Sequence, residues 1–486
     1  MVKVNVTPLL DSLPSRRWFG GKGRPLRDIQ VVDSGVVEDG PPALVLALVR
    51  VRFADDLGDH LYHLPLLMDE DQQARDAFEE VERLAILGDL MAHGTSIKGE
   101  HGVFQFGGPG LDPLAPAGRS SVRRIGAEQS NSSLVLDEHV IVKLFRKVEP
   151  GSNPDLELTR VLTNEAFDHI PQHLGEVVYQ SEVTADEEAN EEFWTVDLGI
   201  AQTFFPEANE GWSKTLDHVE NFLNQIDDLD AREDMRFLTE ERAHDFLRSV
   251  DDLGDATALL HITLAREEAA PELAPEPIDD FDLERWAVRA SELLERVLQV
   301  GDGEIAAARK AIQDRIDALR IVSDAGAKTR VHGDLHLGQV ISTSRGWMFI
   351  DFEGEPARKL DERRAKHSPL RDVAGMLRSF SYAAIASLFA RTEPESPEWQ
   401  RLEPWADMWE TVVRERFLHA YLTRTHEGKF LPADREALST MLDAFEIDKA
   451  LYELSYERSH RPAWTRIPIA GIYKVLERAP DGGRTA

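Results

Sequence analysis

Two polar motifs lie on either side of one short apolar stretch late in the chain, and this arrangement restricts the fold more than any other feature of the sequence. The first motif is VHGDLHLGQV at 331–340, in which Gln339 follows Asp334 after five residues. The second is IDFEGEP at 350–356, which contains Asp351. The stretch between them reads as two short β-strands around a Ser-Arg-Gly turn. Because a hairpin returns its second strand to the start of its first, we expect the two motifs to share one site.

The residue types in these motifs suit phosphoryl transfer. That reaction needs a carboxylate to orient and deprotonate the attacking hydroxyl, and metal ligands to hold the nucleotide phosphates. In protein kinases an amide ligand follows the catalytic aspartate after five residues, as Gln339 follows Asp334 here. We predict Asp334 as the catalytic base. Hard oxygen ligands for Mg²⁺ would come from Gln339, Asp351 and Glu353. The alternative, a loop aspartate with a chance spacing, does not account for the hairpin and the second aspartate.

A kinase also needs a strand lysine, paired with a helix glutamate, to hold the nucleotide phosphates. The segment EHVIVKLFRK offers Lys143, and the helix that Asn153 and Pro154 open offers Glu157. Upstream, GAEQSNSSLVL lacks the glycines of a kinase phosphate loop, but its polar residues can form a hairpin tip that presents N–H groups and hydroxyls. The predicted ATP-binding residues of this tip are Gln129, Ser130, Asn131, Ser132 and Ser133. An exposed strand lysine and a plain polar turn are the alternatives.

The composition excludes several classes of protein. Acidic residues number 88 against 55 basic ones, and a net charge of −33 should repel nucleic acid and anionic lipid. The chain has no cysteine, which excludes disulfides, cysteine-ligated zinc and thiol nucleophiles. The first residues lack the apolar core of a signal peptide, and no apolar run approaches the roughly 20 residues of a membrane helix. We therefore expect a cytoplasmic protein that binds neither nucleic acid nor membrane.

The order of predicted elements indicates two or three units within 486 residues. Segments 28–53 and 60–67 read as β-strands, whereas the chain after residue 214 is helical apart from the hairpin. We predict an α+β, bilobal kinase-like fold. It would consist of a β-rich N-terminal cap domain, an intermediate α+β nucleotide-binding domain and a mainly helical C-terminal catalytic lobe, at 1–100, 101–207 and 208–486.

Several separated motifs together resemble actinobacterial maltokinases, a branch of the aminoglycoside-phosphotransferase-like kinases that also includes glucosamine kinases. Besides HGDLHLGQV and IDFEGEP, the similar segments are SRRWFGGKGR, AEQSNSSLV, VKLFRKVEPGSNPDLEL, SPLRDVAGMLRSFSYA and FEIDKALYELSYERSHRPAW. They occur in the family's order over most of the chain. SRRWFGGKGR at 15–24 resembles the opening of the cap domain, and we expect it to form a packed turn rather than to reach the nucleotide.

The resemblance implies ATP-dependent, Mg²⁺-assisted phosphorylation of the 1-hydroxyl of maltose, which feeds α-glucan and glycogen synthesis. It implies the base and metal roles given above for Asp334, Gln339 and Asp351, and the phosphate-holding pair of Lys143 and Glu157. Asp372, in PLRDVAGMLRSF, matches a family aspartate that braces the catalytic loop. The expected partners are a sugar and ATP, with an association with a trehalose- or maltose-metabolising enzyme left open.

The sugar must lie beside Asp334, within hydrogen-bonding reach of the transferred oxygen. The helix predicted at 442–458 carries polar and aromatic residues at spacings of three and four, hence on one face. With His332 and the residues at the helix exit, the predicted substrate-binding set is Lys449, Tyr452, Glu453, Tyr456, Arg461 and Trp464. Core packing of part of this stripe is the alternative reading.

Two other functions remain open at this point. A glucosamine kinase would use the same catalytic residues, and Glu453 and Glu457 offer carboxylates for an ammonium group, which must be paired when buried. A pseudokinase would bind carbohydrate or nucleotide without turnover. The presence of every phosphoryl-transfer residue argues against the pseudokinase.

Overall fold

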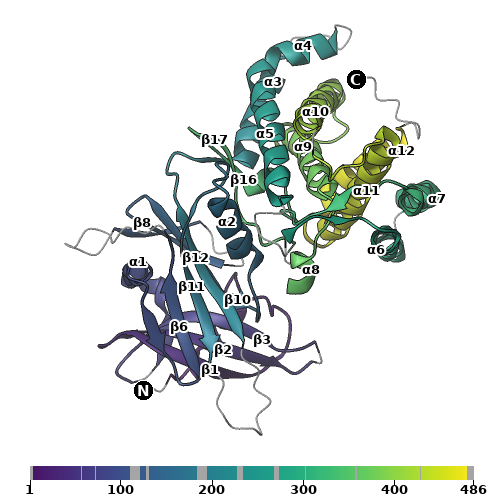
Figure 1. Ribbon diagram of the computed structural model, residues 1–486. Helices are drawn as coiled ribbons and strands as arrows, with labels where there is room; N and C mark the ends of the chain where they lie inside the picture. Colours follow the sequence, from purple (N-terminus) through teal and green to yellow (C-terminus); the bar gives the residue numbers. More distant parts are fainter. Residues whose placement is uncertain are drawn as a thin grey trace. The chain divides into compact units, whose positions relative to one another are not determined.

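The computed structural model describes residues 4–55, 57–71, 73–109, 121–126, 131–182, 194–226, 234–266, 273–301, 303–355, 358–426 and 428–478. The chain forms two compact units (Figure 1). The first unit comprises residues 1–163 and 171–206, and the second comprises 164–170 and 207–486. The residues predicted as cap and intermediate domains both belong to the first unit, and their division at residue 100 stays a prediction.

The first unit is built on two antiparallel sheets. One has the order β1-β2-β3-β10, with β4 also paired to β3, and the other has the order β5-β6-β11-β12-β9-β8-β7. The strands of the first sheet are β1 (Leu26–Glu38), β2 (Ala43–Phe53), β3 (His60–Met68), β4 (Ala74–Asp76) and β10 (Lys147–Val148). Those of the second are β5 (Ser96–Lys98), β6 (Gly102–Gly107), β7 (Val122–Ile125), β8 (Asn131–Leu136), β9 (Val140–Phe145), β11 (His173–Ser181) and β12 (Thr195–Thr203).

Strand β2 is covered on both faces of the first sheet. Its sequence, ALVLALVRVRF, is an almost continuous apolar run rather than an alternating one, and its first seven residues are buried. The segment SRRWFGGKGR packs on this sheet, because Trp18 and Phe19 are buried and the Phe19 ring stacks on Tyr62 at 5.4 Å. The helical elements of the unit are η1 (Thr7–Leu9), η2 (Leu13–Ser15), η3 (Ala77–Ala85), α1 (Ile86–Ala92) and most of α2 (Pro154–Asn164).

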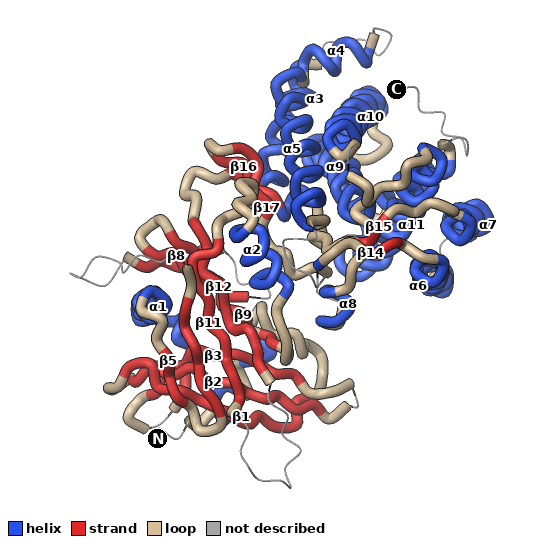
Figure 2. The backbone as a smooth tube through the Cα atoms, in the orientation of Figure 1, coloured by secondary structure: helices blue, strands red, loops and turns tan. Residues whose placement is uncertain are grey.

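The second unit is mainly helical (Figure 2). Its helices are α3 (Gly211–Gln225), α4 (Met235–Arg242), α5 (His244–Leu264), α6 (Asp280–Gln299), α7 (Gly303–Asp317), α8 (Leu360–Arg364), α9 (Leu370–Arg391), α10 (Pro397–Arg424), α11 (Arg435–His460) and α12 (Arg466–Leu476), with short 3₁₀ turns η5 (Ala318–Ile321), η6 (Leu337–Gln339) and η7 (Pro462–Trp464). Two small sheets accompany them, β13-β16-β17 and β14-β15. Their strands are β13 (Asn209–Glu210), β14 (Glu276–Pro277), β15 (Ala327–Lys328), β16 (Val340–Thr343) and β17 (Gly346–Phe349). The α+β fold class is thereby confirmed.

The predicted hairpin between the two polar motifs is present. Strands β16 and β17 pair antiparallel from Val340 opposite Phe349 to Thr343 opposite Gly346. Gly346 has φ +102°, a backbone conformation that favours glycine. The hairpin brings the start of the second motif back to the end of the first, since the Ile350 N–H donates to the Gln339 carbonyl at 3.0 Å.

Helix α9 forms the core of the second unit and packs against α10 and α11. By length and composition alone it could cross a membrane, which corrects the expectation that the chain has no such apolar segment. In this structure 78% of its apolar window is buried inside the protein. A long, mainly apolar helix that its neighbours cover is typical of the centre of a large helical domain.

Candidate active site

The catalytic loop predicted at 331–339 is held by one carboxylate beneath it. The Asp372 Oδ2 accepts the His332 N–H at 2.7 Å, and its Oδ1 accepts the Gly333 N–H at 2.9 Å. Asp372 lies in the first turn of α9 and is 1% exposed. Gly333 has φ +85°, so the loop turns at a glycine directly before Asp334. This geometry orients the residue predicted as the base.

His332 has a different position from the predicted one. Its side chain is buried, its Nε2 donates to the Ile350 carbonyl at 3.0 Å, and its ring lies 4.8 Å from the ring of Phe352. The prediction that this side chain contacts the substrate is wrong, because it points into the core. Instead, His332 ties the catalytic loop to the second polar motif.

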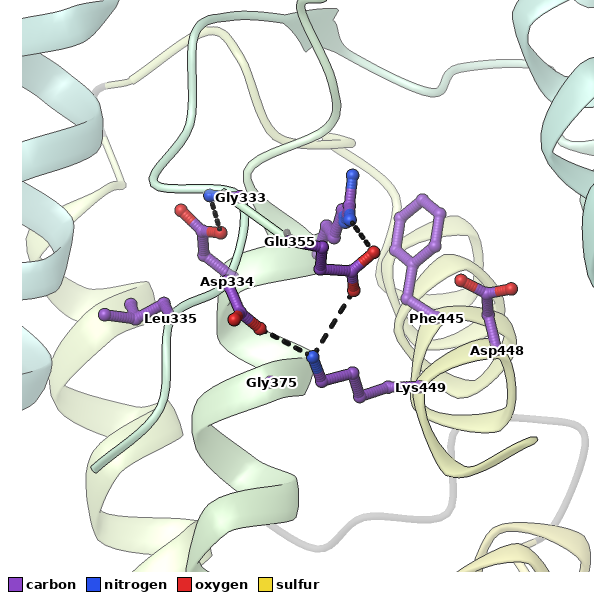
Figure 3. Close-up of a pocket in the computed structure, with 10 residues that line it drawn as sticks. Gly333, Asp334, Leu335, Glu355, Gly375, Phe445, Asp448 and Lys449 are labelled. Atoms are coloured by element: carbon purple, nitrogen blue, oxygen red, sulfur yellow. Dashed lines mark hydrogen bonds and ion pairs between the residues drawn. The ribbon is translucent and has the colours of Figure 1, made fainter. Parts of the chain in front are cut away.

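The carboxylate of Asp334 faces a lysine from α11 (Figure 3). Lys449 Nζ lies 2.8 Å from Asp334 Oδ1 and 3.4 Å from Glu355 Oε1. Burial by itself would lower the pKa of Lys449, but the two carboxylates outweigh burial and raise that pKa above its usual value. Lys449 is therefore an ammonium ion beside the predicted base.

Glu355 and its arginine partners were missed by the sequence reasoning. Glu355 is 5% exposed and accepts from Arg358 Nε at 2.6 Å, while Arg371 Nη2 lies at 3.1 Å. Burial would raise the pKa of Glu355, yet Arg371, Lys449 and Arg358 hold it well below the usual range. The signals were present in the sequence: Glu355 is the last acidic residue of IDFEGEP, and Arg371 directly precedes Asp372.

A small pocket adjoins this charged group. Helix α11 contributes Phe445, Asp448 and Lys449 to its wall. The remaining lining residues come from the catalytic loop, the second motif and α9: Gly333, Asp334, Leu335, Glu355, Arg371, Asp372 and Gly375. Gly375 is needed for the close fit, because a Cβ there would lie 2.5 Å from the Leu335 carbonyl oxygen. The pocket is therefore a direct continuation of the catalytic loop.

The three predicted metal ligands lie together at the end of the hairpin. Gln339 Nε2 donates to Asp351 Oδ2 at 3.2 Å, and carboxylate oxygens of Asp351 and Glu353 lie within 4.8 Å of each other. Asp351 has φ +66°, a strained conformation that the surrounding structure must maintain. Hard oxygen donors in this arrangement fit Mg²⁺.

His336, two residues after the predicted base, is a neutral neighbour. Its Nδ1 accepts the Gly338 N–H at 3.0 Å, and its Nε2 lies 3.9 Å from Asp334 Oδ2. Burial lowers the pKa of His336 to about 4, so the imidazole carries no charge at neutral pH. It is not positioned as a second cation for Asp334.

The predicted sugar-binding stripe on α11 divides into two groups. Lys449 lies beside Asp334, with its Nζ 5.2 Å from the ring centroid of Tyr452. Glu453 is tied down, since its Oε2 accepts from Arg378 Nη2 at 2.8 Å, and burial raises the pKa of Glu453 even against this arginine. Tyr456 is 46% exposed and stacks on His460 at 4.2 Å.

Arg461 and Trp464 form their own contact at the end of α11. The Arg461 guanidinium donates to both carboxylate oxygens of Glu457, at 2.9 and 2.7 Å, and lies 4.3 Å from the Trp464 ring centroid. The Trp464 ring in turn stacks on Phe389 at 5.8 Å. These two residues therefore pack on each other and form a partly exposed surface.

In the first unit, the strand lysine contacts an aspartate two residues before the predicted glutamate. Lys143 Nζ lies 3.0 Å from Asp155 Oδ2, and Asp155 is buried in the first turn of α2. The sequence reasoning named Glu157, which lies two residues further along the same helix and is partly buried. Asp155 follows the Asn153-Pro154 helix start directly, and this was the signal that could have identified it.

Three residues of the polar tip that is predicted to bind phosphates lie in the described part of β8. Ser133 lies opposite Lys143 in the β8–β9 register, so both side chains are on one face of the sheet. Ser132 points the other way: it is 1% exposed and accepts from Arg146 Nε at 2.8 Å, so its predicted hydroxyl contact with ATP is wrong. Asn131 is partly buried at the start of β8, and Gln129 and Ser130 lie outside the described residues.

Comparisons with known proteins agree with this arrangement. Residues 13–96 match the maltokinase N-terminal cap domain, and residues 218–405 match the phosphotransferase enzyme family. A glucosamine kinase of Streptacidiphilus jiangxiensis is 28% identical over 367 residues, covering 74% of each chain. A glucosamine kinase of Mycolicibacterium smegmatis is 26% identical over 369 residues, covering 73% of this chain and 79% of the relative.

Solved structures share the fold over nearly the whole chain. A glucosamine kinase crystal form superposes with a TM-score of 0.68 at 20% identity and covers 96% of this chain and 97% of its own. A glucosamine kinase complex with glucosamine, ADP and inorganic phosphate gives a TM-score of 0.66 at 21% identity, covering 98% and 100%. The two domain matches and the two relatives together support a kinase of the aminoglycoside-phosphotransferase-like type, similar to maltokinases and glucosamine kinases, and the chain is an ATP-dependent sugar kinase.

Proposed function

We propose that this kinase transfers the γ-phosphate of ATP to the 1-hydroxyl of maltose, with Asp334 as the base. The observation that supports a neutral sugar is the ion pair between Lys449 and Asp334 at 2.8 Å. The product, a sugar 1-phosphate, would feed α-glucan and glycogen synthesis in the cytoplasm. An association with a trehalose- or maltose-metabolising enzyme is the partner prediction that accompanies this role.

The roles of the residues follow from the geometry at the loop. Asp334 orients the sugar hydroxyl and accepts its proton, in the position that Asp372 maintains through the loop backbone. Lys449 holds the charge of Asp334 in place until the hydroxyl binds. Gln339, Asp351 and Glu353 would hold Mg²⁺, which neutralises charge on the nucleotide phosphates when bound. In the first unit, Lys143, held by Asp155, would contact the phosphates.

The charge at the pocket argues for a neutral acceptor. Lys449 already supplies one ammonium to Asp334 and Glu355, and Arg371 lies 3.1 Å from Glu355. A substrate ammonium placed about 4 Å from Lys449 would be repelled by roughly 4 kcal/mol at an effective dielectric constant of about 20. Maltose has no charge, and Tyr452, Tyr456 and Trp464 offer aromatic surface on the same part of α11 and its exit for a second ring.

Glucosamine is the second candidate acceptor, and Asp448 is the observation that favours it. Asp448 lines the same pocket, and its Oδ1 is buried without a hydrogen-bond donor among the residues that the structure describes. An ammonium would satisfy such a carboxylate. The two curated relatives named above are glucosamine kinases.

A competition experiment decides between the two acceptors. Wild-type protein is given maltose, glucose and glucosamine at equal concentrations with ATP, and kcat/KM is measured for each. We expect maltose to be the best of the three, because Lys449 excludes the amine and the second ring adds contacts. A higher kcat/KM for glucosamine would contradict the maltose proposal and leave the catalytic residues unchanged.

Two variants test separately how the Lys449 ammonium and the Asp448 carboxylate affect the choice of acceptor. Lys449→Met should raise the ratio of kcat/KM for glucosamine to kcat/KM for maltose, because the ammonium that repels the amine is gone. Asp448→Asn should lower kcat/KM for glucosamine by roughly tenfold, the contribution of one charged hydrogen bond, only if the amine binds there. If Asp448→Asn leaves the ratio of the two kcat/KM values unchanged, the Asp448 carboxylate does not select the acceptor.

A further inference from the structure

A buried histidine contacts the carboxylate that holds the catalytic loop. His261 lies on α5 and is 0% exposed. Its Nε2 is 3.2 Å from Asp372 Oδ2, the oxygen that also accepts the His332 N–H, and its Nδ1 is 2.9 Å from the Tyr421 hydroxyl. A chain of contacts therefore runs from Tyr421 through His261 and Asp372 to the backbone directly before Asp334.

The chemistry of the partners determines the direction of these hydrogen bonds. The Asp372 carboxylate can only accept, and its pKa stays below the usual value although burial opposes this, partly because His261 donates to it. Nε2 of His261 therefore carries a proton. Burial raises the pKa of Tyr421 well above its usual value, so the phenol remains protonated and can donate to Nδ1. Each of the two contacts thus favours the same imidazole tautomer.

Helix packing explains why His261 reaches this place. At Gly254 of α5, an added Cβ would lie 2.6 Å from the Phe417 carbonyl oxygen and 2.9 Å from the Ala420 Cβ on α10. The glycine allows the two helices to approach closely. His261 is seven residues later, hence on the same face of α5, and it meets Tyr421 of α10 with ring centroids 5.6 Å apart.

We propose that His261 is a positioning residue for the catalytic aspartate, which acts by fixing the Asp372 carboxylate and not by touching substrate. The histidine adds a second donor to Oδ2 of Asp372, beside the His332 N–H, and this third hydrogen bond holds the carboxylate in the orientation that reaches His332 and Gly333. The position of Asp334 relative to the sugar hydroxyl then depends on a residue two contacts away. This inference rests on the base role of Asp334 in the proposed function.

The test compares His261→Leu, which removes both hydrogen bonds, with His261→Gln, whose amide can still donate to Asp372. The sugar is whichever acceptor gives the highest kcat/KM in the competition experiment. We expect His261→Leu to lower kcat by roughly 10- to 100-fold, the effect of a small misplacement of the base, with the KM values for ATP and sugar nearly unchanged. His261→Gln should recover most of that loss, and Tyr421→Phe should lower kcat by only a few-fold.

The matched control is His218→Leu on α3, a partly buried histidine of the second unit, which stacks on Phe246 at 4.0 Å. It should leave kcat unchanged and lower only thermal stability. A double-mutant cycle then tests the route of action: adding His261→Leu to Asp372→Asn should lower kcat little further than Asp372→Asn alone. Multiplicative losses, or a folded His261→Leu variant with normal kcat, would overturn the proposal.

Two further results distinguish a failure of the positioning role from a failure of the proposed function. If His261→Leu does not fold, the comparison of His261→Gln and Tyr421→Phe with wild type carries the test, and equal, normal kcat in both would contradict the positioning role. If Asp334→Asn keeps normal turnover, the proposed function fails. If Asp334→Asn loses turnover while the His261 variants keep normal kcat, only the positioning role of His261 is refuted.

Discussion

Asp334 and Lys449 show how one ion pair can prepare a catalytic residue. A catalytic carboxylate must be held in one orientation to meet the hydroxyl that it deprotonates. Lys449 at 2.8 Å supplies the compensating charge, and Glu355 holds the lysine from the other side. The sugar hydroxyl therefore meets an Asp334 whose position is already set by the loop and by Lys449.

Asp334→Asn tests this role by replacing the carboxylate with an amide. The amide keeps the size of the side chain and Lys449 keeps its contact with Glu355, so the fold and ATP binding should be retained. We expect kcat to fall by on the order of 10²-fold or more, the usual effect of losing a general base. Steady-state kinetics together with calorimetric ATP binding measure both quantities, and near-normal turnover would disprove the assignment.

The partner of Lys143 gives a second test at the residue scale. Since Lys143 Nζ lies 3.0 Å from Asp155, Asp155→Asn should raise the KM for ATP and lower kcat more than Glu157→Gln does. Both substitutions are isosteric and lie on the same helix, so they are matched. A larger effect of Glu157→Gln on the KM for ATP would restore the pairing predicted from the sequence.

Helix α2 and strand β12 are joined by a carboxylate whose charge opposes folding. Asp197 of β12 accepts the Asn153 N–H at 2.7 Å, at the start of α2. Burial raises its pKa to about 6, although this N–H and Arg160 act in the other direction. Because the folded pKa lies above the unfolded value, the contribution of Asp197 to stability is fully present below about pH 4 and is lost as the pH rises through about 6.

Asp197→Asn should therefore stabilise the protein at neutral pH. The amide oxygen can still accept the Asn153 N–H, while no charge has to be buried. We expect the free energy of unfolding to increase by up to ~3 kcal/mol at pH 8, from a shift of roughly two pKa units, and to change little at pH 4. Urea denaturation of both proteins across this range measures the difference, and a constant difference between pH 4 and pH 8 would contradict the prediction.

For the whole molecule, net charge is the dominant electrostatic property. With 88 acidic and 55 basic residues, 33 negative charges remain even if every basic residue is paired. Their mutual repulsion destabilises the compact state, and salt reduces it because the screening length falls from about 10 Å at 0.1 M to about 3 Å at 1 M. The ion pairs on the surface oppose this trend only weakly, since exposed pairs contribute roughly 0–1 kcal/mol each.

The midpoint of thermal unfolding should consequently rise by a few degrees between 0.05 and 0.5 M KCl, since a gain of about 1 kcal/mol shifts the midpoint of a large domain by roughly 2–4 °C. Glycerol at matched viscosity serves as the control without ionic screening. A midpoint that falls with KCl would mean that attractive ion pairs outweigh the net repulsion.

The sequence by itself determined the features that depend on local pattern. The hairpin at 340–349, the β-rich start, the helical second half and the loop that presents Asp334 follow from spacing and turn residues, which act over a few positions. Tertiary structure decided which side chains meet. Asp155 contacts Lys143, Ser132 and His332 turn into the core, and Glu355, Arg371 and His261 surround the loop from other elements of the second unit. The physical reason is that a buried charge or hydrogen-bonding group takes whichever partner the packed helices bring within about 3 Å, and that distance is not written in the spacing of any one segment.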